Sequence, residues 1–294
     1  MMIELKDYQE KAIEKLKLET NELLESTEGK ICVFKSPTGS GKTLMVAEFL
    51  KRLVTHRDDD KKLSFIWISV NKLHDQSKES LDKYYEDSRV LKCSNFDDLQ
   101  DKTIGENEIL FFNWQSINKN DNIYIRENEQ DNNLSNVITN TKDEGREIIL
   151  IIDESHHTAK AEKSKEVIDS INPKVTIEVS ATPQIKDLSR IVEVDFKKVQ
   201  EEGMIKKEVA INPEIDKTKL DGKSTDDIVI DSALKKRKDL VKAYAKEGSD
   251  INPLVLIQLP DQKAGVLDRK EDIIEKLKKR GITTENRKLA IYLS

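Results

Sequence analysis

Short apolar runs, rich in β-branched and aromatic residues, alternate along the chain with segments whose apolar residues recur at helical spacing. Runs that are apolar at consecutive positions are typical of strands buried on both faces, as in parallel sheets covered by helices. The predicted strands are Ile31–Phe34, Leu63–Val70, Ile109–Phe112, Ile148–Ile152 and Thr176–Val179. Helical patterns precede and follow the first of these strands. The pattern therefore predicts a three-layer α/β domain.

Polar stretches interrupt this alternation in two places. Residues 118–146 are dominated by Asn, Asp and Glu, which predicts a surface insertion with one short helix near Asn133–Thr139. A second polar and charged stretch lies within residues 197–253. These residues are interpreted as a connector that follows a first domain spanning residues 1–196.

The last part of the chain has too few strands to bury both faces of a sheet. Its predicted elements are a helix (Ser232–Glu247), a strand (Leu254–Leu259), a helix (Arg269–Arg280) and an apolar run (Leu289–Leu293). Residues 254–294 are therefore interpreted as the beginning of a second α/β domain whose remainder is missing from this sequence.

Composition and charge exclude several classes of protein. The chain has 294 residues, and 50 Lys and Arg against 56 Asp and Glu give a net charge of −6. Its longest apolar run is far shorter than the ~20 residues of a membrane span, and the first residues lack a signal-peptide pattern. The two cysteines cannot form a disulfide framework, which favours a cytoplasmic location. The acidic balance does not exclude a nucleic-acid partner, because binding requires only a local basic groove.

The strongest chemical signal is the segment Ser36-Pro-Thr-Gly-Ser-Gly-Lys-Thr43, which lies between a predicted strand and a predicted helix. A phosphate chain is bound by backbone N–H groups on a loop without Cβ atoms, by a helix N-terminus, by a cation and by a hydroxyl that holds Mg²⁺. Ser36 departs from the usual pattern, which has glycine there. The predicted ligand-binding residues are Thr38, Gly39, Ser40, Gly41, Lys42 and Thr43; the alternative is a glycine-rich turn without a ligand.

A buried strand ends in two carboxylates, Asp153 and Glu154. Open α/β sheets bind ligands at the carboxyl ends of their strands. Asp153 can bind Mg²⁺ through a water molecule, and Glu154 can orient or deprotonate an attacking water. The alternative is that the two carboxylates cap the following segment.

Polar residues also follow two of the predicted strands. His156 is expected to form a hydrogen bond near the nucleotide rather than to bind a metal, since the adjacent His157 faces another direction and cysteine ligands are distant in sequence. The segment Ser180-Ala-Thr182-Pro183 by itself indicates only a turn that ends a strand.

Taken in order along the chain, these motifs resemble the first RecA-like motor domain of superfamily 2 helicases and translocases of the DExH type. The motifs that carry the resemblance are Tyr8-Gln9, Ser36–Thr43, Asp153–His156 and Ser180–Thr182. Further segments are similar to the Res subunit of type III restriction enzymes, namely Phe111–Asn118, Glu202–Val209 and Leu254–Pro260. The superfamily resemblance covers Leu5 to about Thr182, and the looser subfamily resemblance extends to Ser294.

The resemblance implies an ATP-dependent DNA translocase or helicase-like motor with ATP and Mg²⁺ as cofactors. It implies catalytic roles for Lys42, Asp153 and Glu154, and Mg²⁺ binding by Thr43 and Asp153. Tyr8 and Gln9 would bind adenine, with Gln9 reading its edge. Coupling of the nucleotide to DNA would involve His156, Ser180 and Thr182, and the DNA backbone would lie along Asn71, Lys72, Asn113 and Gln115.

The resemblance further implies DNA and a modification (methyltransferase) subunit as partners, with no membrane. The arginines that complete such an ATPase, and the nuclease domain, would lie beyond Ser294. This chain alone is therefore expected to be nearly inactive as an ATPase and to have no nuclease activity. The alternatives are a motor of another superfamily 2 system, in repair or type I restriction, and a non-catalytic nucleotide-binding or DNA-binding module.

Overall fold

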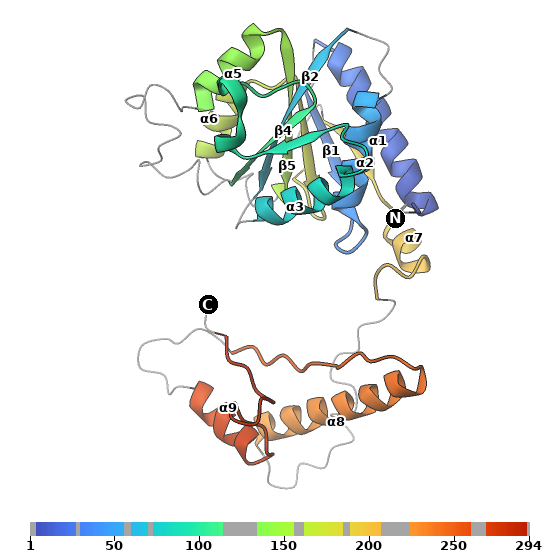
Figure 1. Cartoon of the computed structure of the whole chain (residues 1–294). Coiled ribbons are helices and arrows are strands. Elements are labelled where there is room, and N and C mark those ends of the chain that lie inside the picture. Colours follow the sequence, from blue (N-terminus) through green and yellow to red (C-terminus); the bar gives the residue numbers. More distant parts are fainter. Residues whose placement is uncertain are drawn as a thin grey trace. The chain divides into compact units, whose positions relative to one another are not determined.

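The computed structural model of the chain describes residues 4–27, 30–55, 60–69, 73–113, 134–155, 162–184, 189–206, 224–259 and 269–292. The chain divides into two compact units, Met1–Lys207 and Glu208–Ser294. The first unit contains the sheet shown in Figure 1 and every described residue of the predicted nucleotide site.

The first unit is built on a parallel sheet of seven strands in the order β3-β4-β2-β5-β6-β1-β7. The strands are β1 (Ile31–Lys35), β2 (Lys62–Ser69), β3 (Lys92–Ser94), β4 (Glu108–Asn113), β5 (Arg146–Asp153), β6 (Val175–Ser180) and β7 (Arg190–Glu193). The five strands predicted within this unit are all present, with bounds that shift by two residues at most. The edge strands β3 and β7 are not predicted, because they are short and only partly buried. The predicted α/β class is confirmed.

Helices cover both faces of this sheet. Figure 1 shows α1 (Asp7–Glu25) and α2 (Lys42–Thr55) on one face, and α5 (Leu134–Asp143) and α6 (Glu162–Ile171) on the other. The remaining helices of this unit are α3 (Leu73–Tyr85), α7 (Phe196–Glu201) and the short 3₁₀ helices η1 (Phe96–Asp98) and η2 (Gln100–Lys102). None of the described helices is both long and apolar enough to cross a membrane.

Side chains of each central strand alternate between two hydrophobic cores. In β2, Phe65 and Trp67 join the core beneath α1, α2 and α3, whereas Ile66 and Ile68 join the core beneath α5 and α6. This alternation follows from the period of two along a strand. It explains why the strands are apolar at consecutive positions.

The short helix predicted near Asn133–Thr139 is present as α5, but the structure corrects its placement in a surface insertion. Residues 118–133 lie outside the described residues, but α5 begins at Leu134 and buries Leu134, Val137 and Ile138 in the core beneath α5 and α6. Its apolar residues recur every three or four positions, as a helix that packs on a sheet requires. The end of this polar stretch is therefore part of the core.

The second unit contains α8 (Thr225–Lys246) and α9 (Arg269–Lys278), which pack through Ile230, Ile273 and Leu277. Helix α8 begins at Thr225, earlier than the predicted start at Ser232, because Ser224 caps it. The Ser224 hydroxyl oxygen accepts a hydrogen bond from the Asp227 N–H.

The described residues 224–259 and 269–292 contain no strand. The strand predicted at Leu254–Leu259 is absent because no neighbouring strand pairs with it, and a strand is stable only in a sheet. Leu254 and Leu256 are 88% and 90% exposed. That this unit begins a second RecA-like domain stays a prediction.

Arg52 joins the helices on the face of the sheet that carries α2. Its guanidinium donates to Glu10 and Glu14 of α1, at 2.6 Å each, and to Glu48 of α2, at 2.8 Å. Tyr84 of α3 donates a hydrogen bond to the same Glu48. The hydrogen bonds with Glu10 are the largest cause that raises the pKa of Arg52. One guanidinium therefore fixes the spacing between α1 and α2.

Replacing Arg52 with Ala is expected to lower the free energy of unfolding by about 1–2 kcal/mol, because these carboxylates lose their common partner. Urea denaturation monitored by circular dichroism measures the loss. Lys78→Ala is the control, since the ion pair of Lys78 is with Asp82, one turn away within α3, and its loss should change stability by less than about 0.5 kcal/mol. Equal losses for both variants would contradict this role for Arg52.

Candidate functional site

The segment Ser36–Thr43, here called the phosphate loop, joins the carboxyl end of β1 to the first turn of α2. Gly39 and Gly41 have φ angles of +84° and +85°, in the left-handed region that favours glycine. The Met45 N–H donates to the Gly41 carbonyl at 2.9 Å, so the helix starts directly at the loop. N–H groups in the first turn of a helix lack partners within the helix, so those of α2 could donate hydrogen bonds to a phosphate group at this loop.

Ser36 stabilises the loop from within. Its hydroxyl lies 2.6 Å from the Ser40 hydroxyl, and both side chains are fully buried. Its backbone N–H donates to the Ser180 carbonyl, at 3.1 Å, which ties the loop to the end of β6. The serine that replaces the usual glycine thus has a structural role, and its presence leaves the loop geometry intact.

Tyr8 and Gln9 hold the loop from the side of α1. The Tyr8 hydroxyl donates to the Ser40 carbonyl at 2.7 Å, and Gln9 Nε2 donates to the same oxygen at 3.1 Å. Gln9 Oε1 accepts from the Lys6 N–H at 2.9 Å. A Cβ atom at Gly41 would lie 2.7 Å from Gln9 Nε2, so a side chain there would displace the Gln9 amide and would also be strained by the φ of +85°.

Both polar atoms of the Gln9 amide are therefore engaged, and Gln9 is only 2% exposed. In this structure the amide positions the phosphate loop. That it also reads the edge of an adenine stays a prediction; such a contact requires the second hydrogen of Nε2 or the second lone pair of Oε1.

Lys42, Asp153 and Glu154 converge at the carboxyl edge of the sheet. Lys42 Nζ lies 3.4 Å from Glu154 Oε1. The Glu154 N–H donates to Asp153 Oδ1 at 3.0 Å, and Glu154 has a φ of +51°, a conformation uncommon outside glycine. One lysine therefore faces two adjacent carboxylates.

Burial, and next the charge of Glu154, raise the pKa of Asp153 from its ordinary value of 3.8 to about 6. A hydrogen bond from the Ser77 side chain of α3 acts in the opposite direction. The sequence gives no signal for Ser77, because α3 reaches β5 only through the tertiary fold. A buried carboxylate that lacks a full counter-charge suits a cation ligand.

The donors present fit Mg²⁺. Mg²⁺ is bound in proteins by one or two carboxylates together with phosphate oxygens and waters, and here Asp153 and the Thr43 hydroxyl supply the protein oxygens. The described residues contain no group of three or more His, Cys, Asp or Glu side chains that could hold a metal by themselves. A metal at this site would depend on the phosphate ligand.

A cavity of about 650 Å³ adjoins the phosphate loop. Its lining comes from the phosphate loop, α2, α3 and Glu154, and includes Gly39, Lys42, Thr43, Ser80 and Tyr84. Small-molecule sites commonly measure about 300–1,000 Å³, so this cavity has the size of a ligand site.

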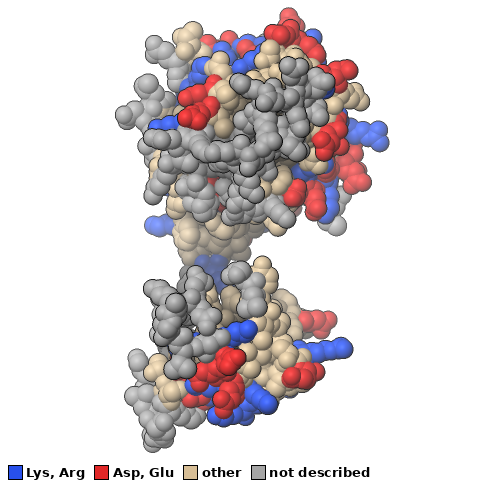
Figure 2. Space-filling view, turned by 90° about the vertical axis from the view of Figure 1, so that its left-hand side faces the viewer, with Lys and Arg blue, Asp and Glu red and all other residues tan. Residues whose placement is uncertain are grey.

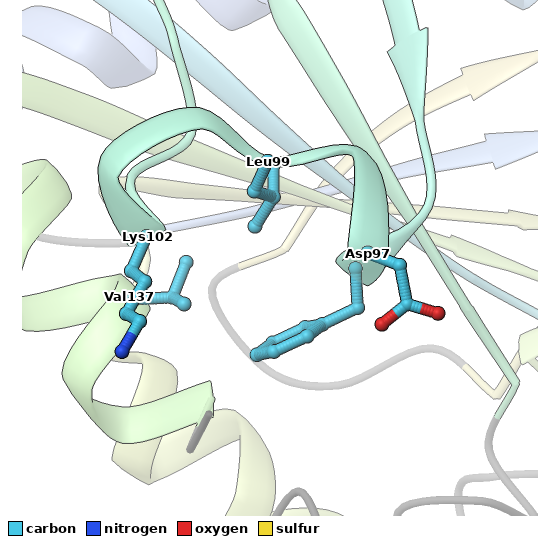
Figure 3. A pocket seen from close by; sticks show the side chains of 5 residues that line it. Asp97, Leu99, Lys102 and Val137 are labelled. Carbon is cyan, nitrogen blue, oxygen red and sulfur yellow. The ribbon is translucent and has the colours of Figure 1, made fainter. Parts of the chain in front are cut away.

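A second cavity, of about 190 Å³, lies on the face of the sheet that carries α5 (Figure 3). It is lined by Phe96, Asp97, Leu99, Lys102 and Val137, and in Figure 3 the Asp97 carboxylate points away from Val137. No residue of the predicted site takes part in it.

The other predicted site residues are only partly placed. Ser180 Oγ accepts a hydrogen bond from the Thr182 N–H at 3.1 Å, so these two residues form one turn beside the phosphate loop. Asn113 ends β4 and pairs in register with Ser69 of β2. Outside the described residues lie His156, Asn71, Lys72 and Gln115.

On the face of the first unit shown in Figure 2, described Lys and Arg side chains are interspersed with Asp and Glu. This face of the first unit therefore presents a surface of mixed charge.

One comparison with known proteins identifies a family. The family model described as "Type III restriction enzyme, res subunit" matches residues 2–185. Among curated proteins, none matches the chain significantly.

Two similar solved structures have low sequence identity to the chain. A nuclease-deletion mutant of the Type ISP restriction-modification enzyme LlaGI, in complex with a DNA substrate mimic, is 14% identical with a TM-score of 0.45, covering 82% of this chain and 22% of that chain. The UvsW helicase from Bacteriophage T4 is 17% identical with a TM-score of 0.35, covering 69% of this chain and 58% of that chain. The chain thus spans less than two thirds of either protein.

Replacing Asp153 with Asn is expected to stabilise the protein when neither nucleotide nor metal is present. Because the folded-state pKa lies above the unfolded one, the carboxyl group favours folding while it is protonated, and that contribution is lost as the pH rises from about 4 to above 6. The variant should therefore exceed the parent by about 1–3 kcal/mol at pH 7.5, and by almost nothing below pH ~4.

Urea denaturation at a series of pH values measures this difference. Asp87→Asn, at an exposed turn after α3, is the matched control and should show no gain that depends on pH. A pH-independent effect of Asp153→Asn would contradict the assignment of the shifted pKa to this carboxyl group.

Proposed function

The chain belongs to the family of the type III restriction enzyme Res subunit, and we propose that its first unit binds and hydrolyses ATP with Mg²⁺ as part of a motor that moves on DNA. The observation that carries the proposal is the phosphate loop at the sheet edge, with Lys42, Thr43, Asp153 and Glu154 gathered beside a cavity of about 650 Å³. The family membership supports a helicase-like motor of superfamily 2.

In the proposed reaction, the loop N–H groups and Lys42 bind the β- and γ-phosphates, and Thr43 with Asp153 hold the metal. Mg²⁺, when bound, neutralises charge on the phosphate oxygens. Lys42 now lies 3.4 Å from Glu154, and phosphate oxygens compete for the same ammonium group. Nucleotide binding would therefore draw Lys42 away from Glu154.

Glu154 is the residue proposed to orient the attacking water and to accept its proton. Once Lys42 turns toward the phosphates, the Glu154 carboxylate is released from this ion pair and can accept a hydrogen bond from a water molecule. The activation of Glu154 would thus depend on a bound triphosphate, which limits water attack to the loaded site.

Coupling of the nucleotide to DNA is proposed to run through the end of β6. Ser180 accepts from the Ser36 N–H of the phosphate loop and from the Thr182 N–H of its own turn. A shift of the loop on nucleotide binding would therefore move this turn directly. His156 is proposed to take part in the same coupling.

DNA is the proposed track, bound weakly through its backbone along Asn71, Lys72, Asn113 and Gln115. Backbone contacts lose affinity as salt counterions compete, so binding should be salt-sensitive and largely independent of sequence. A modification (methyltransferase) subunit is the proposed protein partner, in the cytoplasm. A motor of a repair or type I restriction system remains the alternative within the superfamily.

Replacing Lys42 with Ala is expected to abolish measurable binding of Mg²⁺-ATP, since it removes the cation that faces the β- and γ-phosphates. Isothermal titration calorimetry measures the binding. Lys35→Ala is the matched control, because Lys35 ends β1 next to the loop but pairs with Glu193 at 2.7 Å. Equal ATP affinity in the parent and in Lys42→Ala would refute the site.

The chain is expected to bind ATP but to hydrolyse it at least about 10³-fold more slowly than the ~10 s⁻¹ typical of enzymes. Phosphoryl transfer in such motors needs an arginine from outside the nucleotide site. In the second unit, Arg269 pairs with Asp226, and Arg280 pairs with Asp227 and Asp231. These two arginines are therefore engaged within the second unit, and we do not expect them to complete the nucleotide site.

A phosphate-release assay with and without DNA measures the turnover. Glu154→Gln should retain ATP binding and lose the residual hydrolysis. Fast DNA-stimulated hydrolysis by residues 1–294 would show that this chain, or a second copy of it, already supplies the arginine.

A further inference from the structure

The segment Glu202–Lys206, here called the α7 tail, lies directly against the phosphate loop. A Cβ atom at Gly39 would lie 3.1 Å from Ile205 Cγ2 and 3.7 Å from the Met204 carbonyl oxygen. Ile205 is partly buried and packs against the core beneath α1, α2 and α3. The α7 tail therefore contacts the loop at the residue that precedes the Ser40–Gly41 pair held by Tyr8 and Gln9.

Hydrogen bonds fix the α7 tail to α7. The Gly203 N–H donates to the Gln200 carbonyl at 3.1 Å, and the Met204 N–H donates to the Val199 carbonyl at 3.2 Å. Gln200 Nε2 donates to the Lys206 carbonyl at 3.3 Å. Val199 itself is fully buried, so this helix is anchored in the core. Ile205 is thus presented to Gly39 from a fixed support.

An ion pair connects the α7 tail to the start of α1. Lys6 Nζ lies 3.6 Å from Glu202 Oε2, and the Lys6 N–H is the donor to Gln9 Oε1. The phosphate loop is consequently held on two sides, by Tyr8 and Gln9 at Ser40 and by Ile205 at Gly39. These two supports are themselves joined through Lys6.

We propose that Ile205 is a positioning residue of the nucleotide site: its side chain fixes the Gly39 backbone so that the loop N–H groups point at the phosphates. The inference rests on the proposed function and deepens it. Ile205 acts through Gly39 and does not touch the ligand.

Coupling between two sites is reciprocal, so a nucleotide on the loop stabilises the α7 tail in turn. The α7 tail ends at Lys206, beside the boundary between the two units at Lys207. Nucleotide binding at the phosphate loop would therefore stabilise the chain up to the end of the first unit.

Ile205→Ala is expected to raise the Kd of Mg²⁺-ATP by about 10-fold or more, because small displacements of positioning groups can cost up to ~10² in efficiency. Ile205→Val, which keeps a branched side chain against Gly39, should restore most of the affinity. Val54→Ala is the matched control, since Val54 is also partly buried against the same core but lies near the end of α2. Calorimetry gives the affinity of each variant, and urea denaturation gives its stability.

Hydrogen exchange of the parent protein provides a second readout that involves no variant. Mg²⁺-ATP should slow exchange at the Gly203 and Met204 amides as well as at the phosphate loop. The inference alone would be overturned if Ile205→Ala bound Mg²⁺-ATP with wild-type affinity, or if Val54→Ala lost as much affinity as Ile205→Ala. It would also be overturned if exchange at these two amides stayed unchanged while the phosphate loop became protected. Absence of any ATP binding by the parent would overturn the proposed function together with the inference.

Discussion

A parallel sheet is stable only when both of its faces are covered, and this constraint decides where chemistry can occur in the chain. The five inner strands β4, β2, β5, β6 and β1 leave almost no polar side chain exposed to solvent along their length, because helices cover each face. Most polar and charged groups therefore lie at the strand ends, although Ser64 is buried within β2 and Glu178 within β6. Since parallel strands all end at the same edge, Ser36, Asp153 and Ser180 meet there although they are far apart in sequence.

At that edge the charges are unbalanced. Two adjacent carboxylates, Asp153 and Glu154, face Lys42, and burial disfavours the ionised form of Asp153. An arrangement of this kind destabilises the empty protein and becomes favourable when a cation arrives with its phosphate ligand. Hydrogen bonds hold the phosphate loop in place despite this unfavourable charge arrangement. The Ser40 carbonyl accepts from both Tyr8 and Gln9, which leaves the loop little freedom to collapse onto the carboxylates.

Features that depend on local pattern could be predicted from the sequence. Runs of β-branched residues gave the inner strands, and the Gly-Ser-Gly-Lys-Thr order gave the phosphate loop. Features that depend on tertiary contacts could not: the edge strand β3 has little burial of its own, and α5 is buried because of the sheet it covers rather than its composition. Likewise, nothing in the spacing of Gln9, Ser77 or Ile205 shows that they reach the loop or Asp153. The strand at Leu254–Leu259 was predicted from its apolar residues alone, whereas a strand also needs a partner.

That unpaired segment has a consequence for how the protein behaves in solution. Leu254 and Leu256 are almost fully exposed, and within residues 224–259 and 269–292 no strand lies beside their backbone to occupy its donors and acceptors. Exposed apolar residues next to unpaired backbone groups favour pairing between chains. The inner strands of the first unit offer no comparable site for pairing, because helices cover both of their faces. Self-association and precipitation of the chain at high concentration will therefore begin in the second unit. Added charge near residue 255 will counter this self-association more effectively than any change to the sheet.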